Sequence, residues 1–180
     1  MVGTLDWLPA TEHPELLAAP VAKALEVLGD DADEVLVAAI DPDLADTAAF
    51  CDTYQVGLDI SANCVVVAGK RSGERRMAAC VVLATTRADV NGLVRRHLDA
   101  RKVSFAPMAD AVAETEMEYG GITPVGLPSG WSLLVDAAVA ATDRVVIGSG
   151  VRGSKLLLPG ALVGRLPGAE VLDGLGAPVG

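Results

Sequence analysis

The residues from 119 to 136 contain the backbone groups best suited to chemistry. Four glycines and two prolines fall between Gly120 and Gly130, and no charged residue occurs before Asp136. Glycine leaves its N–H uncovered and accepts positive φ, so a ligand oxygen can approach such a backbone closely. The segment predicts either a pocket wall, as in an oxyanion hole or a carboxylate nest, or a long loop that joins a helix to a strand.

A second glycine-rich motif, Gly-Ser-Gly-Val-Arg-Gly, occupies residues 148 to 153. It matches the Gly-x-Gly-x-x-Gly fingerprint of dinucleotide-binding folds, but that fingerprint opens a helix inside a βαβ unit. Residues 154 to 158 have the pattern of a strand instead, and the chain ends soon after. We therefore predict a tight turn between two strands, with Arg152 and Lys155 directed towards an anionic ligand or towards solvent.

The nucleophilic and metal-binding residue types form no recognisable catalytic set. The chain has three cysteines and two histidines, and His13 and His97 are far apart. Cys64 and Cys80 lie in apolar runs typical of strands, which indicates buried, inert thiols. We expect no metal and no cofactor. Hydrolysis of an activated ester needs no full triad, because positioned donors can stabilise the oxyanion while water takes part in proton transfer.

Charge is distributed unevenly along a chain whose net charge is −10. Residues 1 to 69 contain one basic and 13 acidic side chains, whereas residues 70 to 102 contain nine basic and three acidic ones. Such a basic block predicts either a solvated helix face or a local phosphate-binding patch, because screening makes local charge matter more than the total. The candidate phosphate ligands are Arg71, Arg75, Arg76, Arg95, Arg96, Arg101 and Lys102.

Length and composition predict a single domain over residues 1–180. The 180 residues are 51% hydrophobic and only 3% aromatic, so the core must consist of Ala, Val and Leu. We expect the core at about 14–166 and a loosely held, glycine-rich tail at 167–180. There is no apolar run long enough for a membrane span and no basic start typical of a secretory signal, so we expect a cytoplasmic protein without membrane contact.

Periodicity predicts alternating helices and strands with a hairpin in the middle. We expect longer helices at residues 15–28, 43–54, 86–100 and 107–117, and short ones at 137–141 and 159–166. We expect strands at residues 34–40, 63–68, 77–84, 102–105, 131–135, 144–147 and 155–158. A turn centred on Ser72 and Gly73 joins two of them. The fold class is therefore α/β of the α+β type, with a mixed sheet.

The order of the motifs resembles a known family. The pattern Gly-x-x-x-Pro from Gly120 to Pro124, then Gly126, an apolar strand ending in Asp136, and the run from Gly148 to Leu156 resemble the YbaK-like, prolyl-tRNA synthetase-associated aminoacyl-tRNA deacylases. The resemblance covers residues 20 to 165. It implies a partly barrel-like central sheet surrounded by helices.

The resemblance also implies roles for individual residues. The catalytic group comprises Asn63, Gly120, Gly121, Thr123 and Pro124, and the substrate-binding group comprises Asp136, Gly148, Ser149, Gly150, Arg152 and Lys155. From the residues alone, Asp136 fits a helix cap or a ligand for an ammonium group, and Thr123 fits a carbonyl-orienting or a turn-stabilising role.

One position departs from the family pattern. The family has a lysine at the start of a strand, in a pattern like Ala-Lys-Ser-Leu, whereas this chain reads Ala62-Asn63-Cys64-Val65. An amide can donate a hydrogen bond, but it carries no positive charge and cannot act as a base. Lys70 does not substitute for it, because it lies about 20 Å away along the same strand at 3.3 Å per residue.

These observations lead to three functional hypotheses. The first is a trans-editing hydrolase that removes a small amino acid, such as alanine or cysteine, from tRNA for proline, alone or with a synthetase. The second, favoured by Asn63, is a binding protein on the same scaffold that recognises an aminoacyl-tRNA end or a small amino-acid-like ligand. The third is an unrelated esterase with the glycine loop as its oxyanion hole.

Overall fold

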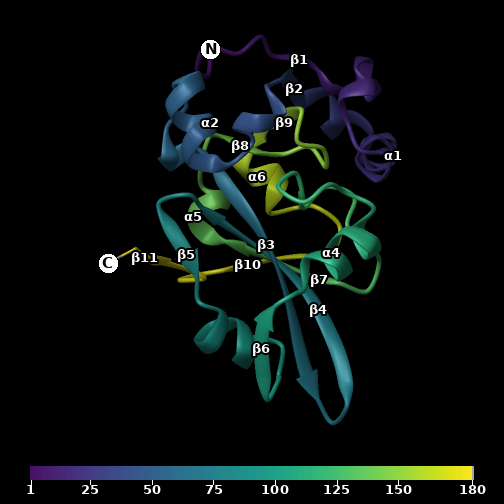
Figure 1. The fold of residues 1–180 in the computed structure, drawn as a ribbon, viewed down its shortest axis with the longest axis vertical. Helices are drawn as coiled ribbons and strands as arrows, with labels where there is room; N and C mark the ends of the chain where they lie inside the picture. The colour runs from purple at the N-terminus through teal and green to yellow at the C-terminus, as the bar shows by residue number, and fades with distance from the viewer. Residues whose placement is uncertain (180) are drawn as a thin grey trace.

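The computed structural model describes residues 1–179 and has an α+β fold with several sheets (Figure 1). The strands are β1 Leu8–Pro9, β2 Leu36–Ala39, β3 Ala62–Arg71, β4 Glu74–Leu83, β5 Thr86–Ala88, β6 Lys102–Phe105, β7 Ser132–Asp136, β8 Arg144–Gly148, β9 Ser154–Pro159, β10 Ala169–Leu172 and β11 Gly176–Pro178. The α-helices are α1 Ala19–Leu28, α2 Thr47–Tyr54, α3 Arg95–His97, α4 Met108–Thr115, α5 Ala137–Ala140 and α6 Gly160–Val163. Short 3-10 turns occur at Ala10–Glu12, Pro14–Leu16, Gly29–Glu34, Pro42–Leu44 and Leu58–Ile60, and a π-helix at Val90–Val94.

The larger sheet is mixed, as the sequence predicts. Its strand order is β10-β7-β4-β3-β6, in which β3 pairs antiparallel with β4 and β6, while β7 is parallel to β4 and β10. The β3–β4 hairpin turns at Ser72 and Gly73, which both have positive φ, as a tight hairpin with right-handed twist requires. The hairpin projects from one end of the molecule together with β6, which pairs with β3 (Figure 1).

A second sheet, with the order β1-β2-β9-β8, lies at the N-terminal end of the molecule. The two sheets touch at a parallel bridge between Ser61, just before β3, and Val146 in β8. A third, two-stranded sheet pairs β5 with β11. The three sheets form no closed barrel within the described residues, and the mixed sheets with their helices agree with the predicted α+β class.

Apolar side chains cover both faces of the second sheet. Leu156 and Leu158 of β9 point into the largest core cluster, whereas Leu157 points into a smaller cluster that contains Phe50 of α2. Because side chains alternate along a strand, Lys155 shares the face of Leu157 and therefore points towards α2. Its neighbours on the adjacent strands are Gly148 and Ala38, whose small size leaves room there.

Two elements differ from the sequence-based predictions. The first long helix begins at Ala19 rather than residue 15, because Pro20 fits the first turn while Leu17 and Ala18 are extended. The helix expected at 86–100 splits into β5, a π-helix and α3, because Thr86–Ala88 pairs with β11. Asp89 accepts hydrogen bonds from the amides of Gly92 and Leu93 and so caps this helical stretch.

Two stretches of the C-terminal tail, within residues 169–178, form strands, contrary to the expectation of a loosely held segment. Residues Ala169–Leu172 add a parallel strand next to β7, and Gly176–Pro178 pairs with β5. Leu175 is fully buried in the cluster beneath the larger sheet. The alternating pattern of this segment is too short to be recognised in the sequence, and only its partners in the sheet stabilise it. No helix among residues 1–179 has the length and apolarity needed to cross a membrane.

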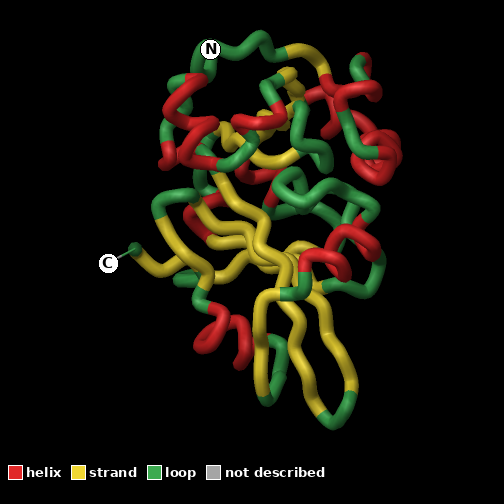
Figure 2. The backbone as a smooth tube through the Cα atoms, in the orientation of Figure 1, coloured by secondary structure: helices red, strands yellow, loops and turns green. Residues whose placement is uncertain are grey.

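The segment between α4 and β7 is a long loop without regular structure (Figure 2). It folds against the turn between β8 and β9. The Gly150 amide donates a hydrogen bond to the Gly121 carbonyl (2.7 Å), and the Glu118 amide donates to the Gly150 carbonyl (2.8 Å). This backbone contact is possible because Gly121 and Gly148 have no side chain between the two segments.

We predict that Gly148→Ala destabilises the fold while Gly153→Ala, in the same turn, does not. A Cβ on Gly148 would lie 2.5 Å from the Gly121 carbonyl oxygen and 2.8 Å from that of Ile122, whereas a Cβ on Gly153 meets nothing closer than Pro42 at 3.9 Å. Overpacking against backbone costs roughly 1–3 kcal/mol. Urea unfolding of both variants measures the difference, and equal stabilities would contradict the close packing of the two segments.

Candidate functional site

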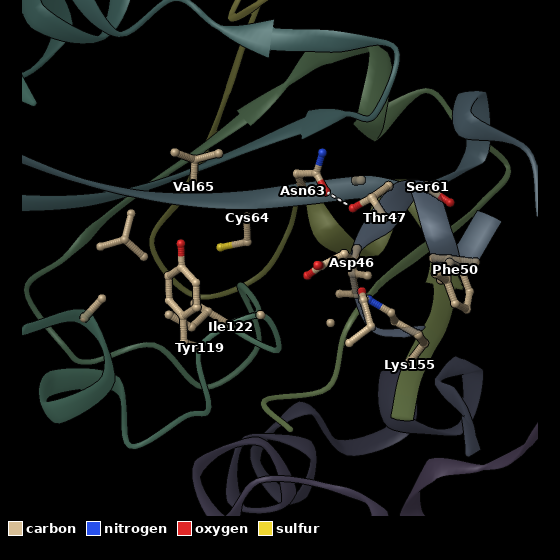
Figure 3. Close-up of a pocket in the computed structure, with 18 of the residues that line it drawn as sticks. Asp46, Thr47, Phe50, Ser61, Asn63, Cys64, Val65, Tyr119, Ile122 and Lys155 are labelled. Atoms are coloured by element: carbon tan, nitrogen blue, oxygen red, sulfur yellow. Dashed lines mark hydrogen bonds between the residues drawn. The ribbon is translucent and has the colours of Figure 1, made fainter. Parts of the chain in front are cut away.

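A cavity of about 370 Å³ opens where the two sheets meet. Its walls come from four parts of the chain: the N-terminal end of α2, the beginning of β3, the end of β8 with Lys155 of β9, and the loop from Tyr119 to Ile122. Phe105, Ala106 and Ala111 close its far end. Figure 3 shows that side chains from these separate segments converge on one space.

The polar side chains gather at one end of the cavity, beside α2. The Thr47 hydroxyl donates a hydrogen bond of 2.6 Å to the Asn63 side-chain oxygen, which ties the first residue of α2 to the start of β3 (Figure 3). Asp46 precedes Thr47 and also lines the cavity. Lys155 enters from the opposite wall. Asp46 and Lys155 are the charged side chains among the lining residues.

The Lys155 side chain is only 9% exposed. Its ammonium group donates a hydrogen bond of 2.9 Å to the Ala45 carbonyl oxygen and lies 5.1 Å from the centre of the Phe50 ring. Burial lowers the pKa of Lys155 below its ordinary value, and the positive charge of Arg152 acts in the same direction, while Cys51 and Asp46 oppose the shift. The cation thus lies in a partly desolvated position at the edge of the cavity.

The other end of the cavity is largely apolar. Ile122, Val66 and Ala111 line it, together with the ring of Tyr119 and the Cys64 side chain. Burial raises the pKa of the Cys64 thiol, with a smaller contribution from Cys80, so the thiol is neutral at neutral pH. Since the thiolate is the reactive form, Cys64 acts here as an apolar wall and not as a nucleophile.

The glycine loop places only some of its predicted residues at the cavity. Gly120 lines it, but the Gly121 amide already donates to the Glu118 carbonyl (2.9 Å). Thr123 is fully buried, and its hydroxyl has no hydrogen-bond partner among the described residues. Pro124 lines a different, apolar hollow beside α1. The segment is thus both a long loop and a cavity wall, and it forms that wall through residues 119 to 122.

The strand ends on either side of the β8–β9 turn contribute Gly148 and Lys155 to the cavity, whereas Ser149 and Gly150 of the turn itself do not line it. The Ser154 hydroxyl donates to the buried Ser149 hydroxyl (2.6 Å) inside the turn. The motif is a tight turn between two paired strands, β8 and β9, as the sequence predicts. Asp136 lies outside the cavity, buried at the end of β7, and its carboxylate packs against Gly176.

Arg152 lies at the rim rather than inside the cavity. Its Nε donates to the Pro42 carbonyl (3.2 Å), and its guanidinium lies 3.5 Å from the Tyr119 carbonyl oxygen and 3.7 Å from a carboxylate oxygen of Asp46. The side chain therefore connects the segment before α2 to the glycine loop. We interpret Arg152 as a residue that positions Asp46 and Tyr119.

Most of the predicted phosphate ligands have partners within the protein. Arg71 pairs with Asp99, and Arg75 pairs with Asp110 (3.2 Å) and Glu114 (2.6 Å). Arg76 and Arg95 donate to the carbonyls of Leu98 and Asn91, respectively. Arg96 is exposed on α3. A separate hollow near the hairpin tip is lined by Lys70, Ser72, Gly73, Arg101 and Lys102.

Sequence reasoning missed three residues that line the polar end and its surroundings: Asp46, Thr47 and Phe50. Asp46 and Thr47 sit at the start of α2, where an Asp followed by Thr is typical of a helix beginning and gives no sign of a binding site. Together with Lys155 and Asn63 they suit a small ligand that has polar oxygen and ammonium groups at one end and a small apolar group at the other.

Solved structures share this fold. A candidate trans-editing enzyme for prolyl-tRNA synthetase superimposes with a TM-score of 0.73 at 19% identity, over 87% of this chain and 94% of its own. A scaffold protein designed to present linear epitopes gives the same TM-score at 20% identity, over 87% and 95% of the two chains. A hypothetical protein also reaches 0.73, at 19% identity over 86% and 99%. At these identities the likeness establishes the fold alone.

No curated protein matches the chain at a significant level. A family model, however, matches residues 41–165, a segment that includes every wall of the cavity. The model is that of the aminoacyl-tRNA editing domain. Because the match covers well over half of the sequence, this chain belongs to the aminoacyl-tRNA editing domain family.

Proposed function

We propose that this protein is a trans-editing hydrolase that removes a small amino acid, such as alanine or cysteine, from mischarged tRNA for proline. The observation that supports the proposal most directly is the cavity, which combines a polar end, an apolar end and a glycine-containing wall within the family segment. The tRNA identity rests on the motif resemblance and on the structural likeness to a candidate partner enzyme of prolyl-tRNA synthetase.

The volume of the cavity favours a small amino acid. Cavities that bind ligands usually measure about 300–1,000 Å³, so 370 Å³ lies near the lower limit. Much of this space must hold the ribose and the ester, and Ile122 and Tyr119 narrow the remainder. A synthetic site cannot strongly reject a smaller or similar side chain by binding alone, so a second, smaller site that hydrolyses the errors is the effective solution.

The polar groups have natural partners in an aminoacyl ester. The Asp46 carboxylate matches the α-ammonium group, and the Thr47–Asn63 pair matches the hydroxyl groups of the terminal ribose. Gly120 is the glycine of this loop that lines the cavity, and its backbone is our candidate for a donor to the ester carbonyl. Water adds to the carbonyl carbon, the bond to the ribose oxygen breaks, and that oxygen takes a proton.

The second candidate function is binding without hydrolysis. Asn63 favours it, because a neutral amide occupies the position at which the resembled family has a lysine, and its side-chain oxygen already accepts from Thr47. Such a protein would recognise the aminoacyl end of tRNA, or a small amino-acid-like ligand, and leave the ester intact.

We expect the wild-type protein to release alanine or cysteine from tRNA for proline faster than the uncatalysed reaction, and to leave prolyl-tRNA intact. The measurement is a deacylation assay on a panel of mischarged tRNAs, with Asn63→Lys as the comparison. Activity confined to the lysine variant would favour the binding protein. No activity in either variant, on any aminoacyl-tRNA, would contradict the editing proposal.

The outer tRNA contact, in this proposal, is a row of cations across the larger sheet. Lys70 in β3 is directly opposite Lys102 in β6 and Arg75 in β4, so the three side chains share one face. Like charges opposite one another destabilise a sheet, and Arg75 alone is neutralised, by Asp110 and Glu114. Lys70 and Lys102, together with Arg101, surround the hollow at the hairpin tip.

This row lies on the same face as the cavity. Cys64, Val66 and Lys70 are separated by even numbers of residues along β3, so their side chains lie on the same face of the sheet. Cys64 and Val66 line the cavity. The six residue steps from Cys64 to Lys70 span about 20 Å at 3.3 Å per step. A tRNA whose 3′ end enters the cavity can therefore place acceptor-stem phosphates along the hairpin. We propose Lys70, Arg101 and Lys102 as the phosphate ligands.

We predict that Lys70→Gln combined with Lys102→Gln weakens tRNA binding and reduces its salt dependence. Each lost phosphate contact should lower the slope of log K against log salt by about 0.7–0.9. Gel shifts at several salt concentrations measure both quantities, and Lys23→Gln, an exposed lysine on α1, is the control. An unchanged slope in the double variant would place the tRNA contact elsewhere.

A further inference from the structure

Lys155 occupies a position that its structural environment does not fully explain. A buried ammonium group is unfavourable unless its donors are satisfied, and it has three of them. The structure provides one acceptor, the Ala45 carbonyl oxygen, and the face of the Phe50 ring. The remaining donor capacity is directed at the cavity that Lys155 lines.

The carboxylate that lines the cavity with Lys155, that of Asp46, forms no ion pair with this cation. Among residues 1–179, the ion pair that Asp46 forms is with Arg152, at 3.7 Å. Asp46 acts on Lys155 only as a more distant negative charge, while Arg152 acts as a positive one. No other cation lines the cavity, because Arg152 stays at the rim and Asn63 is neutral.

The sequence around Lys155 creates the space that this side chain uses. Gly148 on one neighbouring strand and Ala38 on the other lie directly beside it, so neither fills the volume in front of its ammonium group. Any residue other than glycine at position 148 would place its Cβ against the carbonyl oxygens of Gly121 and Ile122. The same glycine thus keeps the loop close and leaves the path from Lys155 to the cavity open.

We propose that Lys155 is a catalytic residue of the editing reaction and donates a hydrogen bond to the carbonyl oxygen of the aminoacyl ester. The inference rests on the proposed hydrolase function. When water adds to the carbonyl carbon, the π electron pair moves to this oxygen, and the positive charge of Lys155 stabilises the oxyanion. The electron pair then re-forms the C=O bond as the bond to the ribose oxygen breaks, and the proton that the attacking water gives up passes to that ribose oxygen. Lys155 stays protonated throughout.

The charges at the site give the substrate one favoured orientation. The ammonium group of Lys155 repels the α-ammonium of an aminoacyl ester and attracts its carbonyl oxygen, while Asp46 attracts the α-ammonium. The amino acid side chain is then directed to the apolar end, between Ile122 and Tyr119. In this chain the cationic donor comes from β9, on the wall opposite the neutral Asn63.

The test compares Lys155→Met, Lys155→Arg and the control Lys23→Met in single-substrate deacylation kinetics. Methionine keeps an unbranched stem over Phe50 but removes the charge. We expect Lys155→Met to lower kcat by about 100-fold or more with KM changed less than about threefold, since loss of one oxyanion donor typically has an effect of 10²–10³. Lys155→Arg should retain part of the activity, and Lys23→Met all of it.

The pH profile and a second-site variant distinguish catalysis from a purely structural role. Wild-type activity, after subtraction of the uncatalysed rate, should fall at alkaline pH with an apparent pKa below that of a free lysine, because burial lowers the pKa of Lys155. The Arg variant should lack this fall, since a guanidinium stays charged. Asn63→Lys added to Lys155→Met should restore activity if both positions reach the same carbonyl.

The possible outcomes separate the two proposals. If the wild type is active and Lys155→Met keeps kcat within about threefold, whether or not its KM rises, the role of Lys155 is overturned while the hydrolase function stands. If the melting temperature of Lys155→Met falls and its activity returns on cooling, the role is structural and the inference is also overturned. If the wild type deacylates no aminoacyl-tRNA, both proposals fail together.

Discussion

The close contact between two glycine-containing segments is the constraint on which the site depends. The loop after α4 lies directly on the turn between β8 and β9, with the Gly150 amide hydrogen bonded to the Gly121 carbonyl at 2.7 Å. Any side chain at Gly121 or Gly148 would meet backbone atoms, which cannot move as easily as a flexible side chain. This contact fixes Tyr119 to Ile122 as one wall of the cavity and brings Lys155 to the other.

Electrostatics inside the cavity follow from this packing. A single cation enters a partly desolvated space from β9, and a single carboxylate stands beside it at the start of α2. Charges in such a space interact more strongly than on the surface, because less water screens them. Arg152 stays at the rim, where it links the segment before α2 to the glycine loop and leaves the interior to Lys155 and Asp46.

The outer surface resolves the apparent conflict between an acidic protein and a nucleic-acid substrate. The net charge is −10, but the acidic residues dominate the first 69 positions, and the basic block forms the β3–β4 hairpin and its neighbours. Several of its arginines are neutralised locally, as Arg71 is by Asp99 and Arg75 by Asp110 and Glu114. What remains for a polyanion is a smaller set of cations on the cavity face of the sheet.

The sequence by itself determined the mixed α+β class, the β3–β4 hairpin and the turn at Gly148 to Gly153, and it left the glycine loop open between a cavity wall and a plain connection. These features depend on local rules, such as positive φ at glycine and apolar periodicity, which a single stretch of chain reveals. Only the tertiary structure decided which residues meet. Asp46 and Thr47 look like an ordinary helix start, Leu175 looks like part of a loose tail, and Lys155 at the start of a predicted strand fits either an anion ligand or a solvent-facing cation. Their roles arise from contacts between segments up to about a hundred residues apart, as between Lys155 and Ala45. Such contacts depend on strand pairing and burial, which no local pattern in the sequence specifies.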